Sequence, residues 1–543
     1  MTTLLIFLLF TGTVGFVTWR ATRKDDHDSA TGYFLAGRSL TWIVVAGSLL
    51  LTNLSTEQLV GLNGGGYSNG MQVMAWEVWS SIAIVLMALV FLPRYLRGGV
   101  RTVSEFLANR FSRGVGTLVS IMLLLSLLTN LLPFVIYSGG LFMRDVFEVE
   151  RLFGGNENAA LVVTIIALGI AGSIYAIFGG LKAVAVSDTL NGIGLLIGGL
   201  LVPILGLQLL GERLGGGGGI MAGFRYLTEN KPEMLNPVAM DEKANIPFST
   251  LFTGMLLITT YYWCTNQAIV QRTFGSRSLA EGQKGVLFAA LMKLLGPFYL
   301  VLPGIIAWHL FSGNLENGDL AYGALVLEVF QSPLMLGFFA AVIFGAILSS
   351  FNSGLNSATT LFSVDIYKNL INRDASEERM VKVGKIFGIC VAIGAIAVAP
   401  LISKASGGLF DLMKNLAMLY NIPLLALVLL AIFSKRTPAF AVYVGVIVGI
   451  VFYTWFGFFQ QVPDTGLRKF FGYELNWLHI GAINFALIMV IMLTIRYIRP
   501  RPEPYEQSHT GDVDITPWKW AKPCGIGVLV LIAAMYLLMS RFG

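Results

Sequence analysis

The sequence predicts an all-α protein that crosses a lipid bilayer many times. Hydrophobic residues make up 55% of its 543 positions and charged residues only 13%, with a mean hydropathy of +0.72. Soluble domains average about 25% charged residues. Apolar runs of about 20 residues, the length that spans the hydrocarbon core, recur along the whole chain. The formal net charge of +6 is then expected in loops next to the bilayer, and it does not indicate nucleic-acid binding.

These apolar runs predict about fourteen transmembrane helices. They lie at 3–19, 40–63, 72–95, 114–141, 159–179, 186–212, 246–271, 283–310, 333–362, 380–402, 410–433, 437–459, 476–498 and 522–541. The first run has no basic residues before it, so we interpret it as a spanning helix and not as a cleaved signal. With its N-terminus outside, the inner segments hold more than twice as many Lys and Arg residues as the outer ones. An even helix count then places the C-terminus outside too.

The second apolar run turns polar near its middle, at Thr52-Asn53-Leu54-Ser55-Thr56-Glu57-Gln58. Polar stretches are costly in lipid, about 2.5–3.5 kcal/mol for a charge at a helix centre. Such a stretch persists only where it lines a cavity or faces protein. A broken helix of this kind is typical of midplane binding sites in secondary transporters. The alternative is an unbroken buried helix whose few polar groups are satisfied.

A second polar stretch, at 259–267, lies five helices after the first. Because five is odd, the two halves of the chain would have opposite orientations in the membrane. Inverted repeats of this type place the substrate between two discontinuous helices. The spacing therefore favours an inverted-repeat transporter.

Few polar side chains interrupt the other apolar runs. Glu77 and Ser80 are three residues apart and share a helix face, and Lys293 lies in the eighth run. Together with Asn53 and Gln58, these groups suit the hydroxyls of a neutral polyol, while an aromatic ring covers its apolar face. Pairing of Glu77 with Lys293 would lower the cost of burying each. A purely structural ion pair is the alternative.

Adjacent hydroxyls occur at Ser349 and Ser350 in an otherwise apolar run. Hydroxyls plus the freed carbonyls of a broken helix form an oxygen cage of low charge, which suits a monovalent cation. A divalent site would be expected to hold several carboxylates. Alternatively, the serines bond their own helix or ease helix packing.

Other chemistry is not indicated. The three cysteines lie far apart, which argues against a disulfide framework or a metal cluster. The glycines at 64–66 and 179–180 lack the Lys-Ser/Thr of a nucleotide loop. We see no nucleophile–base pair, so an enzyme is not expected.

Five motifs together carry a family resemblance. They are Tyr33-Phe34-Leu35-Ala36-Gly37-Arg38, Asn53-Leu54-Ser55-Thr56-Glu57-Gln58, Tyr175-Ala176-Ile177-Phe178-Gly179-Gly180-Leu181, Gln271-Arg272-Thr273 and Asn356-Ser357-Ala358-Thr359-Thr360. From Tyr33 to about Arg436, the chain resembles the sodium/solute symporter family, and within it the bacterial sodium/sugar cotransporters. The resemblance implies the leucine-transporter fold, with ten core helices in two five-helix inverted repeats.

The implied organisation divides the chain into five parts. These are an extra helix and cytoplasmic loop at 1–39, a first repeat at 40–212, an extracellular Gly-rich loop at 213–245, a second repeat at 246–433, and three peripheral helices at 434–543 with a cytoplasmic linker at 499–521.

The resemblance also implies site residues. The sodium positions are Leu51, Leu54, Ala346, Ser349 and Ser350, and a second sodium site, which only some family members have, would use Asp188 and Asn352. The substrate positions are Asn53, Gln58, Glu77, Ser80, Thr259, Lys293 and Asn415, and the gates are Leu62, Trp76 and Tyr262.

Some of these positions depart from the sugar transporters that the chain resembles. Those proteins often carry Asn at Thr259, Tyr at Trp76, Met at Leu62 and Gln at Asn415, and members with a second sodium carry a hydroxyl at Asn352. The departures reshape the pocket and leave the sugar and the stoichiometry open. No role follows for Lys414.

We therefore expect a sodium-driven symporter that imports a hexose, such as glucose or galactose, by alternating access. Its setting would be a bacterial inner membrane, as a monomer or weak oligomer. A symporter of an amino acid, a sialic acid or another organic anion is the nearest alternative, and a carboxylate at Glu77 disfavours an anion. A channel or a solute sensor is a further alternative. Two interrupted helices with gate aromatics disfavour an open pore, and no soluble output domain is evident to favour a sensor.

Overall fold

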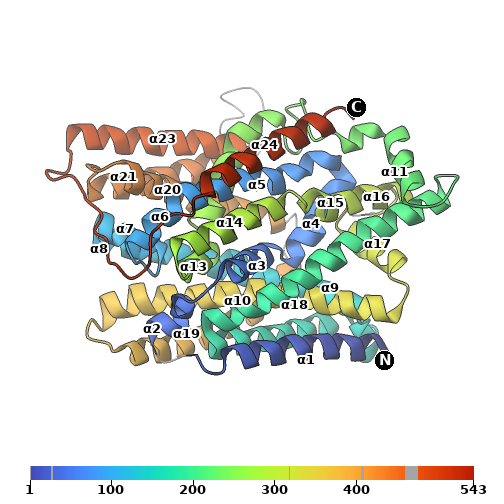
Figure 1. Ribbon diagram of the computed structural model, residues 1–543, viewed down its shortest axis with the longest axis horizontal. Coiled ribbons are helices and arrows are strands. Elements are labelled where there is room, and N and C mark those ends of the chain that lie inside the picture. Colours follow the sequence, from blue (N-terminus) through green and yellow to red (C-terminus); the bar gives the residue numbers. More distant parts are fainter. Residues whose placement is uncertain (1, 26–28, 317, 405–408, 459–474, 543) are drawn as a thin grey trace.

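The computed structural model describes residues 2–25, 29–316, 318–404, 409–458 and 475–542. Most of its helices run along the long axis of the molecule (Figure 1). Within the described ranges there is no named β-strand, only isolated bridges that join Leu40 to Ser276 and Ser278 to Asp514. The prediction of an all-helical chain is confirmed.

The helices of the first half are α1 (Thr2–Thr22), α2 (Ala30–Leu35), α3 (Trp42–Asn53), α4 (Thr56–Asn69), α5 (Ala75–Leu86), α6 (Leu92–Arg97), α7 (Val103–Arg110), α8 (Arg113–Ser126), α9 (Leu132–Val146) and α10 (Glu157–Arg213). Those of the second half are α11 (Ile220–Glu229), α12 (Gly254–Cys264), α13 (Gln267–Phe274), α14 (Leu279–Lys293), α15 (Gly296–Leu300), α16 (Leu302–Leu310), α17 (Ala321–Val329), α18 (Pro333–Thr360), α19 (Glu377–Val398), α20 (Leu409–Phe433), α21 (Ala439–Tyr453), α23 (Trp477–Ile498) and α24 (Ala521–Met539).

Shorter 3₁₀ or π turns connect or extend these helices. They are η1 (Ala36–Arg38), η2 (Gly70–Met74), η3 (Met87–Phe91), η4 (Leu127–Leu131), η5 (Val149–Phe153), η6 (Pro232–Leu235), η7 (Phe248–Phe252), η8 (Gly318–Leu320), η9 (Leu361–Ile371), η10 (Ala399–Lys404) and η11 (Thr454–Phe458). The π turn η9 carries α18 on to Ile371, beyond the predicted end of the ninth run at 362.

Ten helical segments among the described residues are long and apolar enough to cross a membrane. The count rises to eleven if the bent pair Leu279–Lys293 and Gly296–Leu310, which meet at 50°, forms one span. This count is lower than fourteen because a break in a predicted run leaves helices that are too short to be counted, such as the twelve-residue α3. Fourteen spans therefore stays a prediction.

Helix α10 lies at the centre of the packing. It contacts α3, α9, α18 and α19. A kink divides it at Gly180, where φ is +61°, so the predicted runs at 159–179 and 186–212 are its two arms. Glycine is suited to this backbone conformation because a Cβ there is disfavoured. It would also lie 2.9 Å from the carbonyl oxygen of Tyr33.

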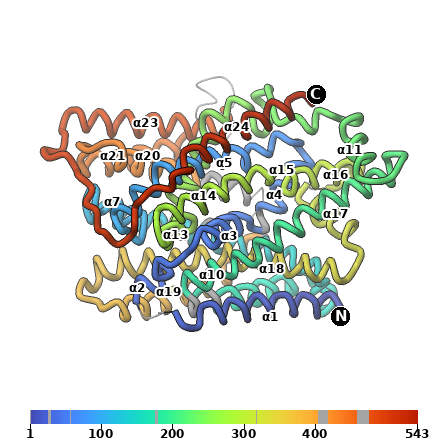
Figure 2. Tube along the Cα trace, viewed as in Figure 1, coloured from blue at the N-terminus to red at the C-terminus, as the bar shows by residue number. Residues whose placement is uncertain are grey.

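The peripheral helices lie on opposite flanks of this centre. Helix α1 packs against α10 and α18, and α24 packs against α5 and α14. Helix α1 begins and α24 ends at the same end of the molecule (Figure 2). That arrangement agrees with an even number of crossings.

Helix α7, which finishes at Arg110, lies at the opposite end of the molecule (Figure 1). Buried Arg110 donates hydrogen bonds there to the carbonyl oxygens of Ser434 and Thr437. Its guanidinium also lies over the rings of Phe111 and Tyr505, at 4.6 and 4.9 Å. Burial lowers the pKa of Arg110 to about 10, so the group stays charged at pH 7. It holds the segment after α23 against the helices of this end.

The segment at 213–245 is more ordered than a Gly-rich connector. After the glycines at 215–219 the chain forms α11, which packs along α10. The buried residues of α11, Gly223 and Leu227, are four apart and therefore share one face. The expectation of a loop was therefore incomplete. The search for apolar runs of about 20 residues does not detect a ten-residue helix with only one apolar face.

Close packing of α4 on α16 gives a stability prediction. The Gly304 amide donates to the Asn63 side chain at 3.1 Å, and a Cβ at Gly304 would overlap the Asn63 carbonyl oxygen. We expect Gly304→Ala to cost about 1–3 kcal/mol, because a backbone atom cannot move aside cheaply. Thermal unfolding in detergent measures this. Gly323→Ala is the matched control, since its Cβ would meet nothing within 4 Å. Equal melting temperatures for both variants would contradict the prediction.

Candidate functional site at the broken helices

The second predicted helix is broken where its sequence turns polar. Helix α3 ends at Asn53 and α4 begins at Thr56, with Leu54 and Ser55 in non-helical conformations between them. The Ser55 amide bonds the Asn53 oxygen, and the Gln58 amide bonds the Ser55 oxygen. The carbonyls of Leu51 and Leu54 are thus not bonded by the amides that a continuous helix would supply. These are the two carbonyls assigned to sodium from the sequence.

Helix α18 brings the serine pair to this break. Ser349 and Ser350 are both buried, and the Ser350 hydroxyl donates to the Thr52 carbonyl at 3.3 Å. The Ser349 hydroxyl interacts with the Asp188 carboxylate, but it makes no hydrogen bond of ordinary length to the described residues. Ala346 lies one turn earlier on the same helix and is also buried. A buried hydroxyl without a close hydrogen bond, next to freed carbonyls, fits a monovalent cation, because buried oxygens need a partner.

Asp188 of α10 lies beside this region. Its carboxylate accepts hydrogen bonds from Ser48 at 2.7 Å and from Thr52 at 3.4 Å, both on α3. Its second oxygen has no described partner, and neither has the side-chain oxygen of Asn352. Ser349 and Asn352 line one cavity of about 20 Å³. That volume is enough for a water-sized particle. The unpartnered oxygens are compatible with the proposed second sodium position.

The buried ion pair predicted from the sequence is present. The Lys293 ammonium of α14 lies 2.5 Å from the Glu77 carboxylate of α5. It also donates to the Asn53 side-chain oxygen at 2.5 Å, and it lies 5.5 Å from the centre of the Trp263 ring. Both charges are 1% exposed. This cluster joins α3, α5 and α14 next to the break, and its formal charge sums to zero.

The other predicted substrate residues have varied surroundings. Gln58 is half-buried on the first turn of α4, and its side-chain oxygen has no described partner. Ser80 donates to the Trp76 carbonyl at 2.6 Å and Thr259 to the Met255 carbonyl at 2.8 Å, so each hydroxyl bonds its own helix. Asn415, like Lys414, lies on α20, but both side chains fall outside the described residues.

The predicted gates lie on three helices. Leu62 is buried on α4. Trp76 of α5 stacks on Trp477 of α23, with ring centres 6.1 Å apart and planes 17° apart. Tyr262 of α12 is half-buried and packs edge-on against Trp263. The Trp76–Trp477 contact involves a peripheral helix that the sequence did not connect with the site.

A second break separates α12 from α13. Helix α12 ends at Cys264, and Asn266 caps α13 by accepting from the Ala268 amide at 2.9 Å. This break lies within the polar stretch predicted at 259–267. The two interrupted helices expected from the sequence are therefore both present.

Sequence reasoning missed a polar chain that leads from this second half to Asp188. Buried Arg272 of α13 donates to the Ser353 hydroxyl, which lies 3.1 Å from the Thr52 hydroxyl. Thr52 in turn bonds Asp188. One signal was available, because Ser48 and Thr52 are four residues apart and so share the face of α3 that meets Asp188.

Helix α13 is held to its neighbours by a further set of bonds. The Gln271 side chain donates to the Phe34 carbonyl at 2.9 Å and to the Thr360 hydroxyl at 2.8 Å, and it accepts from Ser357 at 2.9 Å. These residues belong to three of the motifs noted in the sequence. Together these bonds tie α13 to α2 and α18.

Comparisons with known proteins agree with this architecture. The model of the sodium:solute symporter family matches residues 33–449. The chain is 44% identical to the symporter YidK of Escherichia coli (strain K12), over 99% of this chain and 91% of that protein. It is 30% identical to the sodium/glucose cotransporter of Vibrio parahaemolyticus, over 95% of this chain and 94% of that one.

A solved structure has the same fold. A substrate-bound, outward-open sodium-coupled sialic acid symporter aligns with a TM-score of 0.74 over 93% of this chain and 99% of that one. The two sequences are 20% identical, so the likeness concerns the fold alone.

Proposed function

The chain belongs to the sodium:solute symporter family, and from that premise we propose that it imports a neutral hexose, such as glucose or galactose, or a related polyol. Sodium is the coupling ion, and the protein is an integral membrane transporter and not an enzyme. The similarity to a sodium/glucose cotransporter over nearly the full length supports a sugar as the substrate.

The observation that carries the proposal is the cluster of Asn53, Glu77 and Lys293. It presents a carboxylate, an ammonium and an amide beside the break in the first core helix. Such groups both donate and accept, as the hydroxyls of a sugar do. The salt bridge also changes the reason why an anionic substrate is disfavoured, which the sequence analysis based on the negative charge of Glu77. Glu77 is compensated by Lys293, so the cluster favours a neutral solute by its overall neutrality and not by a free negative charge.

Sodium acts as a cargo that also organises the site. The carbonyls of Leu51 and Leu54 and the hydroxyls of Ser349 and Ser350 would hold it, with Ala346 nearby. These residues join α3 to α18, so a bound cation would stabilise the break and keep Asn53 and Gln58 in place. Loss of sodium would loosen the break and open the gate at Tyr262. Asp188 and Asn352 would hold a second sodium.

One sodium suffices to drive accumulation. A membrane potential contributes about 2.3 kcal/mol per 100 mV. A tenfold concentration gradient contributes about 1.4 kcal/mol more. The sum of roughly 3.7 kcal/mol corresponds to several-hundred-fold accumulation.

The finer architecture belongs to the same proposal. Fourteen spanning helices would include two inverted repeats at 40–212 and 246–433, with peripheral helices at 434–543. Both termini would face outward from a bacterial inner membrane, and the protein would act as a monomer or weak oligomer. The common end of α1 and α24 supports one part of this, that both termini face the same side.

Uptake by proteoliposomes tests the substrate. We expect radiolabelled glucose or galactose to accumulate under an inward sodium gradient, and not when choline replaces sodium. Protein-free liposomes are the control, and unlabelled sialic acid and proline are the competitors. Sodium-driven uptake of an anion or amino acid without sugar uptake would exclude the sugar proposal. Absence of any sodium effect on any of these solutes would contradict the coupling itself.

A further inference from the structure

Two pockets adjoin on the flank of the molecule formed by α14 and α24. The first, of about 580 Å³, is lined by Arg94, Arg97, Lys519 and Lys522 together with apolar residues and Trp518. The second, of about 410 Å³, is an apolar groove between Leu287, Phe288 and Leu291 of α14 and Val528 and Leu531 of α24. Trp518 lines both pockets. The charged chamber and the apolar groove are therefore neighbours that meet at Trp518.

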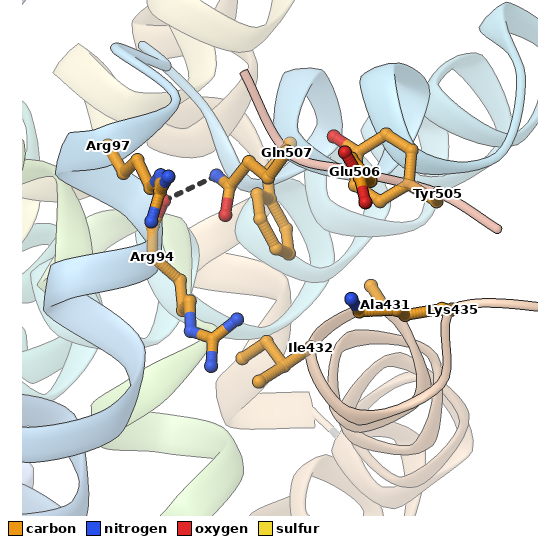
Figure 3. A pocket seen from close by; sticks show the side chains of 9 residues that line it. Arg94, Arg97, Ala431, Ile432, Lys435, Tyr505, Glu506 and Gln507 are labelled. Carbon is orange, nitrogen blue, oxygen red and sulfur yellow. Dashed lines mark hydrogen bonds between the residues drawn. The ribbon is translucent and has the colours of Figure 1, made fainter. Parts of the chain in front are cut away.

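The charged chamber holds four cations from two elements. Arg94 and Arg97 are three residues apart on α6. Lys519 precedes α24 by two residues, and Lys522 lies on its first turn. None of the four forms an ion pair with a carboxylate in the described part of the chain. Arg94 and Arg97 also line a neighbouring pocket that contains Lys435 and Glu506 (Figure 3). The local charge is strongly positive.

Hydrogen bonds from the helices fix the walls of this chamber. The Trp518 amide bonds the Gln283 side chain at 2.8 Å, and the Leu279 amide bonds the Asp514 carbonyl at 2.8 Å. On the other side, the Gln507 side chain donates to the Arg94 carbonyl at 2.6 Å (Figure 3). The segment between α23 and α24 is thereby held on α6 and α14. The chamber is a fixed feature of the fold and not a gap beside a loose chain.

We propose that these pockets bind one anionic phospholipid. Its phosphodiester headgroup would lie among the four cations, and one acyl chain would lie in the groove between α14 and α24. Basic pockets between spanning helices recognise anionic headgroups, and Arg offers paired donors to phosphate oxygens. A zwitterionic lipid would leave the cations uncompensated, and a soluble phosphate would not use the groove. The site is independent of the transported solute.

Removal of two cations tests the headgroup half of the site. In full-length protein, the double variant Lys519→Gln/Lys522→Gln is expected to bind phosphatidylglycerol about 30-fold more weakly. Each lysine near the membrane surface contributes about the same free energy of binding to an anionic lipid, and the two contributions add. Native mass spectrometry with phosphatidylglycerol or phosphatidylcholine counts the bound lipid. Arg20→Gln/Lys24→Gln removes two exposed cations elsewhere and should bind like the wild type. Equal binding of the two lipids, or an unchanged double variant, would overturn the proposal.

Filling the groove tests the acyl-chain half. A Cβ at Gly527, which lines the groove, meets nothing within 4 Å, so the backbone there accepts a side chain and Gly527→Phe adds bulk to the groove. We expect phosphatidylglycerol binding to weaken about tenfold or more, as the chain loses buried methylenes. Glycerol phosphate is the soluble probe, and it should bind much more weakly than the lipid. If it binds as tightly as the lipid, the chamber is a soluble-anion site and the lipid proposal fails.

Discussion

Replacing Lys293 by alanine is expected to destabilise the protein by about 3–5 kcal/mol, because it leaves the Glu77 carboxylate buried without a counter-charge. The two charged atoms are 2.5 Å apart, and both side chains are almost wholly buried. Asn53 would lose its hydrogen bond from the ammonium as well. Thermal unfolding in detergent should show a large fall, and sodium-driven uptake should be lost even at temperatures where the variant stays folded.

A double variant separates stability from transport. Glu77→Leu/Lys293→Met removes both charges, and replacing a buried pair by hydrophobic groups of similar size is often neutral or stabilising. We expect this variant to recover most of the stability but not uptake, because the donors and acceptors for solute are gone. Arg151→Ala is the control, since its pair with Glu148 is exposed on both sides and worth little. Full uptake by the double variant would show that the pair is only structural.

The sequence predicted a feature of this site where only a few residues could satisfy the physical requirement. A polar run inside an apolar helix has to break or face protein, so the break at Leu54 and Ser55 was predictable. A buried carboxylate needs a counter-charge, and Lys293 is the only lysine that lies more than five residues from the end of its apolar run. The pairing of Glu77 with Lys293, across 216 positions, followed from that scarcity.

Hydroxyl groups gave no such guidance. A serine or threonine in a helix can bond its own carbonyl, as Ser80 and Thr259 do, or a neighbouring element, as Ser48 and Thr52 do. The sequence does not distinguish the two choices, so the chain from Arg272 to Asp188 was missed. The stacking of Trp76 on Trp477 was missed for another reason. It depends on where a peripheral helix lies, which hydropathy does not indicate.

Replacing Ser350 by alanine is expected to weaken the apparent affinity for sodium roughly 10–100-fold, since a lost bond to a charged group costs about 1.5–3 kcal/mol. The Ser350 hydroxyl bonds the Thr52 carbonyl, next to the Leu51 and Leu54 carbonyls that the break leaves without helical partners. Its removal should therefore weaken the link between α18 and the broken helix. Uptake measured across a series of sodium concentrations gives the shift.

The matched control is Ser173→Ala on α10, whose hydroxyl bonds only its own helix, at the Gly169 carbonyl. It should keep the wild-type sodium dependence. Ser350→Thr, which retains a hydroxyl, should lie closer to the wild type than Ser350→Ala does. A substrate site that was merely damaged would lower uptake at every sodium concentration, whereas loss of an ion ligand is overcome at high sodium. Uptake by Ser350→Ala that stays low at saturating sodium would therefore exclude Ser350 as an ion ligand.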